Sequence, residues 1–278
     1  MAVAIVTDST SDIEPQRAQG AGITIVPLFV TFGDLRYRDL VDLSRAAFYE
    51  RLVMDSALPG TSQPTAAMFE DAFAAAPSDT VLCITISSHL SGTINSARAA
   101  AQRTASKRVE IFDSQSASGG LGLMVLRAAE MASQGASVES ILEALERERR
   151  TAAVFACIPD LSHLQRTGRI GRARAALGTL MRIVPVLAVE EGQVVAKAQV
   201  RTFSRALDTM LDLCMESIGD PAQARIVIMH TNAPELAAAN RSALLSRLGT
   251  APRTLEVWEA GPVIATHGGP GAVGICTG

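Results

Sequence analysis

Short apolar runs, each followed by a hydroxyl-rich segment and then by a helical pattern, recur three times in the first half of the chain. The runs cover residues 3–7, 81–86 and 109–112 and are rich in valine and isoleucine, which is typical of strands buried on both faces. This repeated unit predicts a parallel sheet with helices on both faces, a three-layer α/β fold. Ligands of such sheets collect at the carboxyl ends of the strands, where the hydroxyl-rich loops fall.

The pattern between the first two units is different. Residues 23–32 read as one β-rich run and residues 34–40 as a turn with a short hairpin arm. Ser44 is placed to cap a helix that extends through residue 54. The loop at 58–64 follows, and Thr65 can cap the next helix.

Beyond residue 150 strands and helices alternate without the hydroxyl-rich loops. Strands are expected at 152–158, 184–189, 194–200, 225–230 and 254–258, and helices at 203–217 and 234–248. The sequence EEGQ at 190–193 predicts a hairpin turn. We therefore expect an N-terminal α/β domain at 1–150 and a C-terminal α+β domain with a mixed sheet at 151–278.

Composition narrows the possible functions of the 278 residues. Hydrophobic residues make up 48%, aromatic residues 4% and charged residues 19%, with a net charge of −3. A slightly acidic chain with few aromatics is a poor candidate for binding nucleic acid. No apolar stretch is long enough to span a membrane, and no signal-peptide pattern opens the chain, so we expect a cytoplasmic protein. The cysteines lack metal-ligand spacing, so we expect no metal site and no cofactor.

Two hydroxyl-rich loops are candidate anion sites. The segment TSQPT at 61–65 contains Thr61 and Ser62, and SSHLSGT at 87–93 contains Ser91, Gly92 and Thr93. Such hydroxyls can simply cap helices, and one hydroxyl is enough for that role. With the free N–H groups of a helix N-terminus they can also bind an anion.

Three further motifs bear on function. The glycines of DSQSASGGLG at 113–122 match neither GxGxxG nor GxxxxGK, so a nucleotide site is not expected there. The run QRTGRIGRAR holds Arg166, Arg169, Arg172 and Arg174, which form either a solvated basic face or a surface for carboxylate, phosphate or an acidic partner.

The segment THGGPG at 266–271 resembles the oxyanion loop of some α/β-hydrolases. Those enzymes need a nucleophilic serine downstream, and no serine follows Gly271. A pair of Ser91 and His267 could still act on an ester or thioester, or a neutral His267 could donate to a bound carboxylate. The sequence leaves both readings open.

Taken together, VTDSTSD, TSQPT, SSHLSGTINSA, DSQSASGGLG, LQRTGRIG and THGGPGAVG resemble the DegV family in their order and approximate spacing. The resemblance covers nearly the whole chain. It implies a hairpin-bearing insertion at about 26–58 and a lipid tunnel between the two domains. It also implies that Thr61, Ser62, Ser91, Gly92, Thr93 and His267 surround a fatty acid carboxylate.

The resemblance further implies a bacterial, non-catalytic protein that binds a long-chain fatty acid such as palmitate, stearate or oleate. It implies that the protein presents the carboxylate to the catalytic subunit of an ATP-dependent fatty acid kinase and carries the acyl-phosphate for phospholipid synthesis. Arg169, with Arg166 and Arg172, is placed near the head group or the docking face. We expect a monomer. The alternatives are a Ser–His hydrolase and a regulatory module that uses the arginine cluster.

Overall fold

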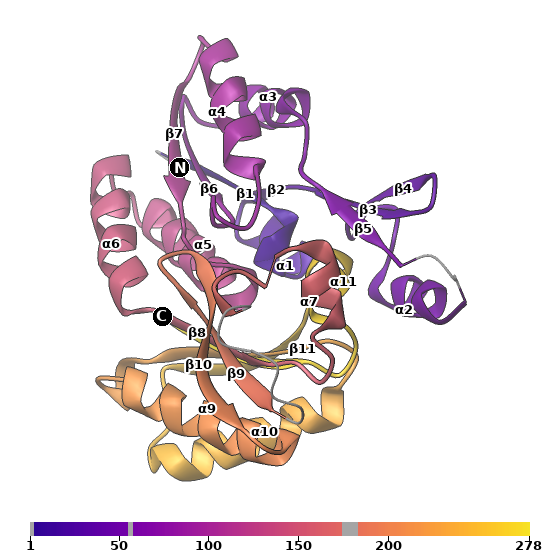
Figure 1. Cartoon of the computed structure of the whole chain (residues 1–278). Helices are drawn as coiled ribbons and strands as arrows, with labels where there is room; N and C mark the ends of the chain where they lie inside the picture. The colour runs from indigo at the N-terminus through magenta and orange to yellow at the C-terminus, as the bar shows by residue number, and fades with distance from the viewer. Residues whose placement is uncertain (1–2, 55–57, 174–182) are drawn as a thin grey trace.

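The computed structural model describes residues 3–54, 58–173 and 183–278, and these residues form three β-sheets (Figure 1). The first sheet is parallel, with the strand order β2-β1-β6-β7. Its strands are β1 (Ala4–Asp8), β2 (Ile23–Val26), β6 (Thr80–Thr85) and β7 (Arg108–Asp113). Alternate residues of β1 and β6 point to opposite faces, and both faces are buried.

Helices cover both faces of the parallel sheet. One face packs on α3 (Ala66–Ala75) and α4 (Thr93–Arg103) through a cluster that includes Phe69, Phe73 and Cys83. The other face packs on α1 (Pro15–Gly20), α5 (Ser118–Ser133) and α6 (Val138–Thr151). The prediction of a parallel sheet between two helical layers is confirmed.

The second sheet is small and antiparallel, with the order β4-β3-β5. Its elements are β3 (Phe29–Phe32), β4 (Leu35–Arg38) and β5 (Gly60–Ser62), with α2 (Arg45–Met54) beside them. The run 23–32, expected as one strand, is two strands in different sheets. Pro27 lies between them and has no N–H to continue a ladder. The expected loop at 60–62 is strand β5, which pairs with β3.

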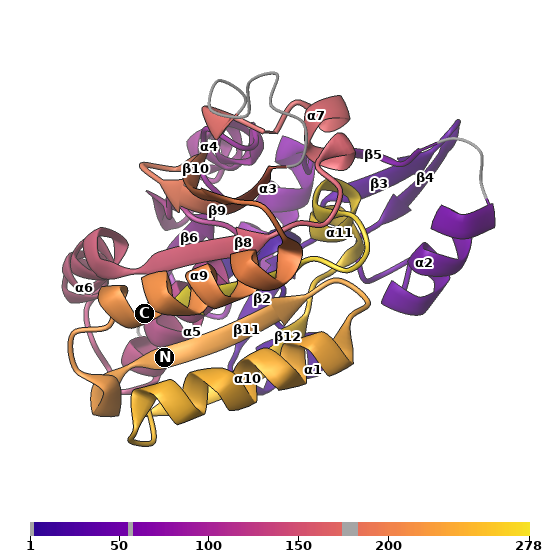
Figure 2. The ribbon, with the colours of Figure 1, turned by 60° about the horizontal axis from the view of Figure 1, so that its bottom comes forward.

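The third sheet is mixed, with the order β10-β9-β8-β13-β11-β12. Its strands are β8 (Ala153–Cys157), β9 (Val184–Glu190), β10 (Gln193–Val200), β11 (Arg225–His230), β12 (Thr254–Glu259) and β13 (Val273–Thr277). Figure 2 shows α9 (Phe203–Ser217) and α10 (Pro234–Leu248) along one face of this sheet. Only β11 and β12 pair in parallel among these described strands.

Helix α5 joins the first and third sheets. Leu123 of α5 packs against Met229 of β11 and Cys276 of β13 on the face of the mixed sheet that α9 and α10 leave open. Two short helices, α7 (Ser162–Thr167) and α11 (Pro262–Gly268), lie beside the same face and contact each other. Among the described residues no helix is both long and apolar enough to cross a membrane.

Candidate functional site

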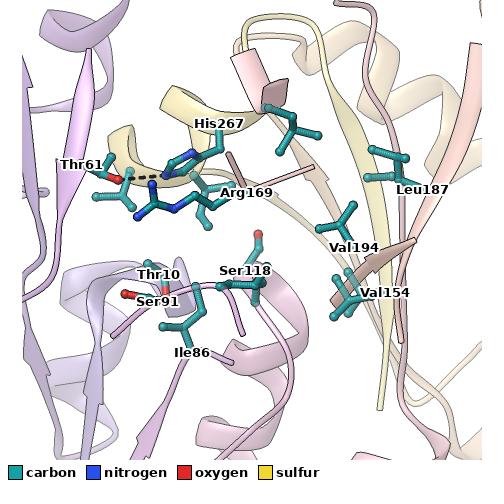
Figure 3. Close-up of a pocket in the computed structure, with 18 of the residues that line it drawn as sticks. Thr10, Thr61, Ile86, Ser91, Ser118, Val154, Arg169, Leu187, Val194 and His267 are labelled. Carbon is teal, nitrogen blue, oxygen red and sulfur yellow. Dashed lines mark hydrogen bonds between the residues drawn. The ribbon is translucent and has the colours of Figure 1, made fainter. Parts of the chain in front are cut away.

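A cavity of about 170 Å³ lies between the carboxyl end of the parallel sheet and the open face of the mixed sheet. We call it the main cavity. Its wall includes Thr10, Leu28, Thr61, Ser62, Gln63, Ile86, Leu90, Ser91, Ala117, Ser118, Val154, Ala156, Ile158, Leu164, Arg169, Leu187, Ala188, Val189, Val194, Val263, Ile264, His267 and Gly268. In Figure 3 Thr61, His267 and Arg169 lie at one side, and Val154, Leu187 and Val194 lie at the other. The cavity therefore has a polar end and an apolar end.

Strand alternation explains the apolar end. On β8, Val154 and Ala156 face the cavity, whereas Phe155 and Cys157 face the core under α9. Because side chains alternate along a strand, one sheet supplies both the core of its own layer and the wall of the cavity. The apolar residues of this strand therefore serve both the hydrophobic core and the cavity wall.

The polar end is built on a hydrogen bond between Thr61 of β5 and His267 of α11. Thr61 Oγ1 lies 2.9 Å from His267 Nε2 (Figure 3). His267 Nδ1 is shielded from solvent and has no hydrogen-bond partner among the described residues. Burial, with the nearby charges of Arg169 and His163, lowers the pKa of His267 to about 3. The imidazole is therefore neutral near neutral pH.

Ser62 and Thr65 play different parts in the TSQPT segment. Thr65 caps α3, because Met68 N–H donates to Thr65 Oγ1 at 3.4 Å. Ser62 lines the main cavity, where its hydroxyl accepts a hydrogen bond from Arg36 at 3.3 Å. The capping interpretation therefore explains Thr65 alone and leaves Thr61 and Ser62 at the cavity.

Of the second loop, only Ser91 among the three predicted residues lines the main cavity. Buried Thr93 supports it, since the two hydroxyl oxygens lie 2.8 Å apart and Thr93 N–H donates to Ser91 Oγ at 3.3 Å. A Cβ atom at Gly92 would overlap the side-chain oxygen of Gln63. Gly92 thus admits Gln63, whose amide nitrogen donates to Ser96 Oγ at 2.9 Å.

The arginines lie at different depths. Arg169 lines the main cavity and donates to the Thr167 carbonyl at 2.8 Å. Arg166 is exposed and, with His163, lines an outer cavity of about 350 Å³ that also reaches Thr61 and His267. Arg172 is exposed and pairs with Glu191 at 3.4 Å. Arg174 lies outside the described residues.

A second outer cavity, of about 320 Å³, lies on the other side of Arg169. It is bounded by residues 88–92, by Gly168 and Gly171, and by the start of β10. Arg169 borders the main cavity and both outer cavities. The polar end of the main cavity is therefore close to the molecular surface on two sides.

The hydrolase geometry is not formed. Ser91 Oγ bonds to Thr93, and His267 Nε2 bonds to Thr61, so the described residues contain no hydrogen bond between Ser91 and His267. A histidine whose pKa is about 3 is also a weak general base at neutral pH. The arrangement favours binding of a carboxylate over activation of a serine.

Sequence reasoning missed several wall residues. Thr10, from the segment VTDSTSD, and Ser118, from DSQSASGGLG, both line the cavity. Their hydroxyl groups are the feature of the sequence that could have identified them. The residues of the apolar wall, for example Ile158, Leu187 and Ile264, could not be recognised from the sequence, because apolar side chains that line a cavity are chemically the same as those of the core.

Two buried carboxylates, Asp12 and Asp39, lie near the start of α11, the helix that carries His267. Asp12 accepts hydrogen bonds from Ser118 Oγ at 2.6 Å and from Gly261 N–H, the N-cap of α11, at 2.8 Å. Asp39, which follows β4, is 1% exposed and has no partner of normal hydrogen-bond geometry among the described residues. Burial raises the pKa of Asp12 and of Asp39 to about 7. The described residues contain no cluster of side chains suited to a metal ion.

Comparison with known proteins gives a consistent result. The family model described as an uncharacterised protein of the DegV family matches residues 2–277. A DegV domain-containing protein of Deinococcus radiodurans is 40% identical over 277 residues, which cover 99% of this chain and 98% of that protein.

Two solved structures are similar over the whole fold. A structure showing fatty acid binding by a DegV family protein from Thermus thermophilus has a TM-score of 0.93 and 36% identity, and covers 100% of this chain and 99% of its own. DegV of Bacillus subtilis, described as a fatty acid binding protein, has a TM-score of 0.90 and 33% identity, with coverages of 100% and 99%.

Proposed function

This chain belongs to the DegV family, and from that membership and the main cavity we propose that it binds one long-chain fatty acid such as palmitate, stearate or oleate. The carboxylate lies at the end formed by Thr61, Ser62, Ser91, Arg169 and His267, and the tail lies along the apolar wall. The observation that carries the proposal is a single cavity that is polar at one end and apolar at the other.

The Thr61–His267 pair retains one free proton whichever way its hydrogen bond runs. Neutral His267 has one N–H and Thr61 has one O–H, and their shared hydrogen bond uses only one of these two protons. When His267 Nε2–H donates to Thr61, the Thr61 O–H remains free for a carboxylate, which can only accept hydrogen bonds. Burying the carboxylate without such donors would be unfavourable.

The tail accounts for most of the expected affinity. Each buried methylene contributes roughly 0.8 kcal/mol, and a long-chain fatty acid has more than a dozen of them. The wall from Val154 through Leu187 to Val194 offers only hydrocarbon to such a chain. Head-group substitutions should therefore weaken binding without abolishing it.

A mass measurement tests this proposal directly. Native mass spectrometry of the purified protein should show one added mass in the fatty acid range, and extraction should identify the lipid. After delipidation, Thr61→Val should weaken oleate binding about tenfold, because it removes one hydrogen bond to a charged group. Thr151→Val, at the exposed end of α6, serves as the matched control. A protein that is purified empty and binds neither oleate nor palmitate would contradict the proposal.

The second part of the proposal concerns a partner. We infer that the protein works in the cytoplasm, where it presents the carboxylate to a fatty acid kinase subunit and carries the acyl-phosphate for phospholipid synthesis. A carboxylate oxygen would attack the γ-phosphorus of ATP, the bond from this phosphorus to the bridging oxygen of ADP would break, and ADP would leave. The outer cavities beside Arg169 support the idea, because they bring the polar end close to the surface.

Reconstitution tests the partner role. With a fatty acid kinase catalytic subunit, ATP and oleate, the acyl-phosphate can be trapped by hydroxylamine as a hydroxamate. We expect Arg166→Glu to reduce its formation while oleate binding persists, because Arg166 is exposed at an outer cavity. Arg205→Glu, on the exposed surface of α9, is the control. Equal rates in the two variants would argue against docking at Arg166.

A further inference from the structure

A second, smaller cavity adjoins the main one. This inner chamber has a volume of about 110 Å³ and lies between α5 and the strands β8, β11 and β13. Its wall includes Met229, His230, Thr231, Ala272 and Cys276. Six further wall residues, Ser118, Val154, Ala156, Ile158, Ile264 and Gly268, also line the main cavity. The two spaces are therefore separated by side chains that both contact.

The polar side chains of the chamber wall are engaged elsewhere. Ser118 donates to Asp12 at 2.6 Å, and Thr231 donates to the Gly269 carbonyl at 2.6 Å. His230 Nδ1 accepts from Ala233 N–H at 3.4 Å. Burial raises the pKa of the Cys276 thiol to about 12, so it remains neutral. Unlike the polar end at Thr61 and His267, this wall suits hydrocarbon and not a carboxylate.

Met229 limits the chamber on the side of α5. Its side chain is 5% exposed and packs over Gly119, where a Cβ atom would come within 2.8 Å of Met229 Sδ and 3.2 Å of Cys276 Sγ. Methionine is flexible and adapts to irregular space. A ligand that entered the chamber would therefore contact the flexible Met229 side chain at its end.

We propose that the inner chamber is the site of the terminal methyl segment of the acyl chain and that Met229 sets the greatest chain length the protein accepts. This inference rests on the proposed binding of a fatty acid. It adds a subsite and a length-determining residue. Short chains end in the main cavity, and chains of 16 to 18 carbons extend between the shared wall residues into the chamber.

Filling the chamber tests the assignment. Ala272 lines the chamber and does not line the main cavity, so Ala272→Leu adds hydrocarbon at the chamber wall. Each methylene excluded from burial weakens binding about fourfold. With delipidated protein we expect affinity for stearate to fall at least tenfold and affinity for laurate to change less than threefold. Ala243→Leu, on α10 and outside both walls, is the matched control.

Opening the end wall gives an effect of opposite sign. Met229→Ala should shift the preferred length to chains longer than those that the wild-type protein prefers, as measured by competition with fatty acids of 12 to 20 carbons. This variant also tests the assignment should Ala272→Leu fail to fold, as judged by circular dichroism. Equal loss for laurate and stearate in a folded Ala272→Leu variant, or an unchanged length profile in Met229→Ala, would overturn the assignment. Failure of the wild type to bind any fatty acid would instead overturn the proposed function.

Discussion

Replacing Asp39 with asparagine tests how much the buried charge of Asp39 destabilises the folded protein. Asp39 follows β4, whose sheet also carries Thr61. The Ser9 hydroxyl and the Val263 N–H lie close enough to favour its charged form, yet neither forms a hydrogen bond of normal geometry with it. Asparagine has nearly the same shape and cannot ionise, so Asp39→Asn removes the charge with little change in packing.

The direction of the effect follows from the pKa. Burial raises the pKa of Asp39 from 3.8 to about 7, and the nearby charge of Asp8 adds to the rise. Between these two values the folded protein holds a proton that the unfolded chain has released, so stability falls as pH rises through this window. Above pH 7 Asp39 is charged in both the folded and the unfolded protein, and the folded state carries the full cost of burying that charge. A shift of this size corresponds to about 4 kcal/mol.

Urea unfolding at several pH values measures this penalty. We expect the free energy of unfolding of Asp39→Asn to exceed that of the wild type by a margin that grows by about 2 to 3 kcal/mol between pH 5 and pH 8. Asp71→Asn, on the exposed surface of α3, is the control for replacing an aspartate with asparagine at a solvent-exposed position. A constant difference across this range, or a wild type that is the more stable protein at pH 8, would refute the reasoning.

Three further substitutions probe the polar end. His267→Ala should weaken oleate binding about tenfold, with no titration near pH 6 in the wild-type affinity, because the pKa of His267 is about 3; isothermal titration at pH 5.5 to 8 checks both. Arg169→Gln should weaken binding and reduce its dependence on salt, whereas Arg172→Gln, which changes an exposed residue outside the main cavity, should do neither. Gly92→Ala should displace Gln63 and weaken oleate binding several-fold without lowering the melting temperature by more than a few degrees.

Periodicity predicted the layered part of the fold. The strands β11 and β6 and the helices α9 and α10 were predicted within about a residue, because each buries a continuous apolar run or stripe. Short elements such as β5 and α7 were not predicted. Three to six residues have too few positions for a hydrophobic period, and β5 exists because β3 offers it a partner.

In the candidate site, too, the sequence identifies some residues but not the contacts between them. The hydroxyls of Thr61 and Ser91 were visible as an excess over what helix capping requires. The contact of Thr61 with His267 joins residues 206 positions apart, which no local pattern encodes. That Ser91 lines the cavity, whereas Thr93 hydrogen-bonds to it and does not line the cavity, depends on the turn that the chain makes at that loop.

The donors at the polar end suit the proposed function, in which the carboxylate is first bound and then presented to a kinase. A bidentate arginine pair would bind it more strongly, since charge-assisted hydrogen bonds are about twice as strong as neutral ones. Here the donors at the polar end are mainly neutral: the hydroxyls of Thr61 and Ser91 and an uncharged His267. Arg169 donates one of its N–H groups to the Thr167 carbonyl, so that group is not available to a ligand. Under the proposed function, weak head-group binding combined with a buried tail would keep the lipid attached while its carboxylate is passed to the kinase. For that reason we expect substitutions at the polar end to change the rate of transfer more than the retention of the lipid.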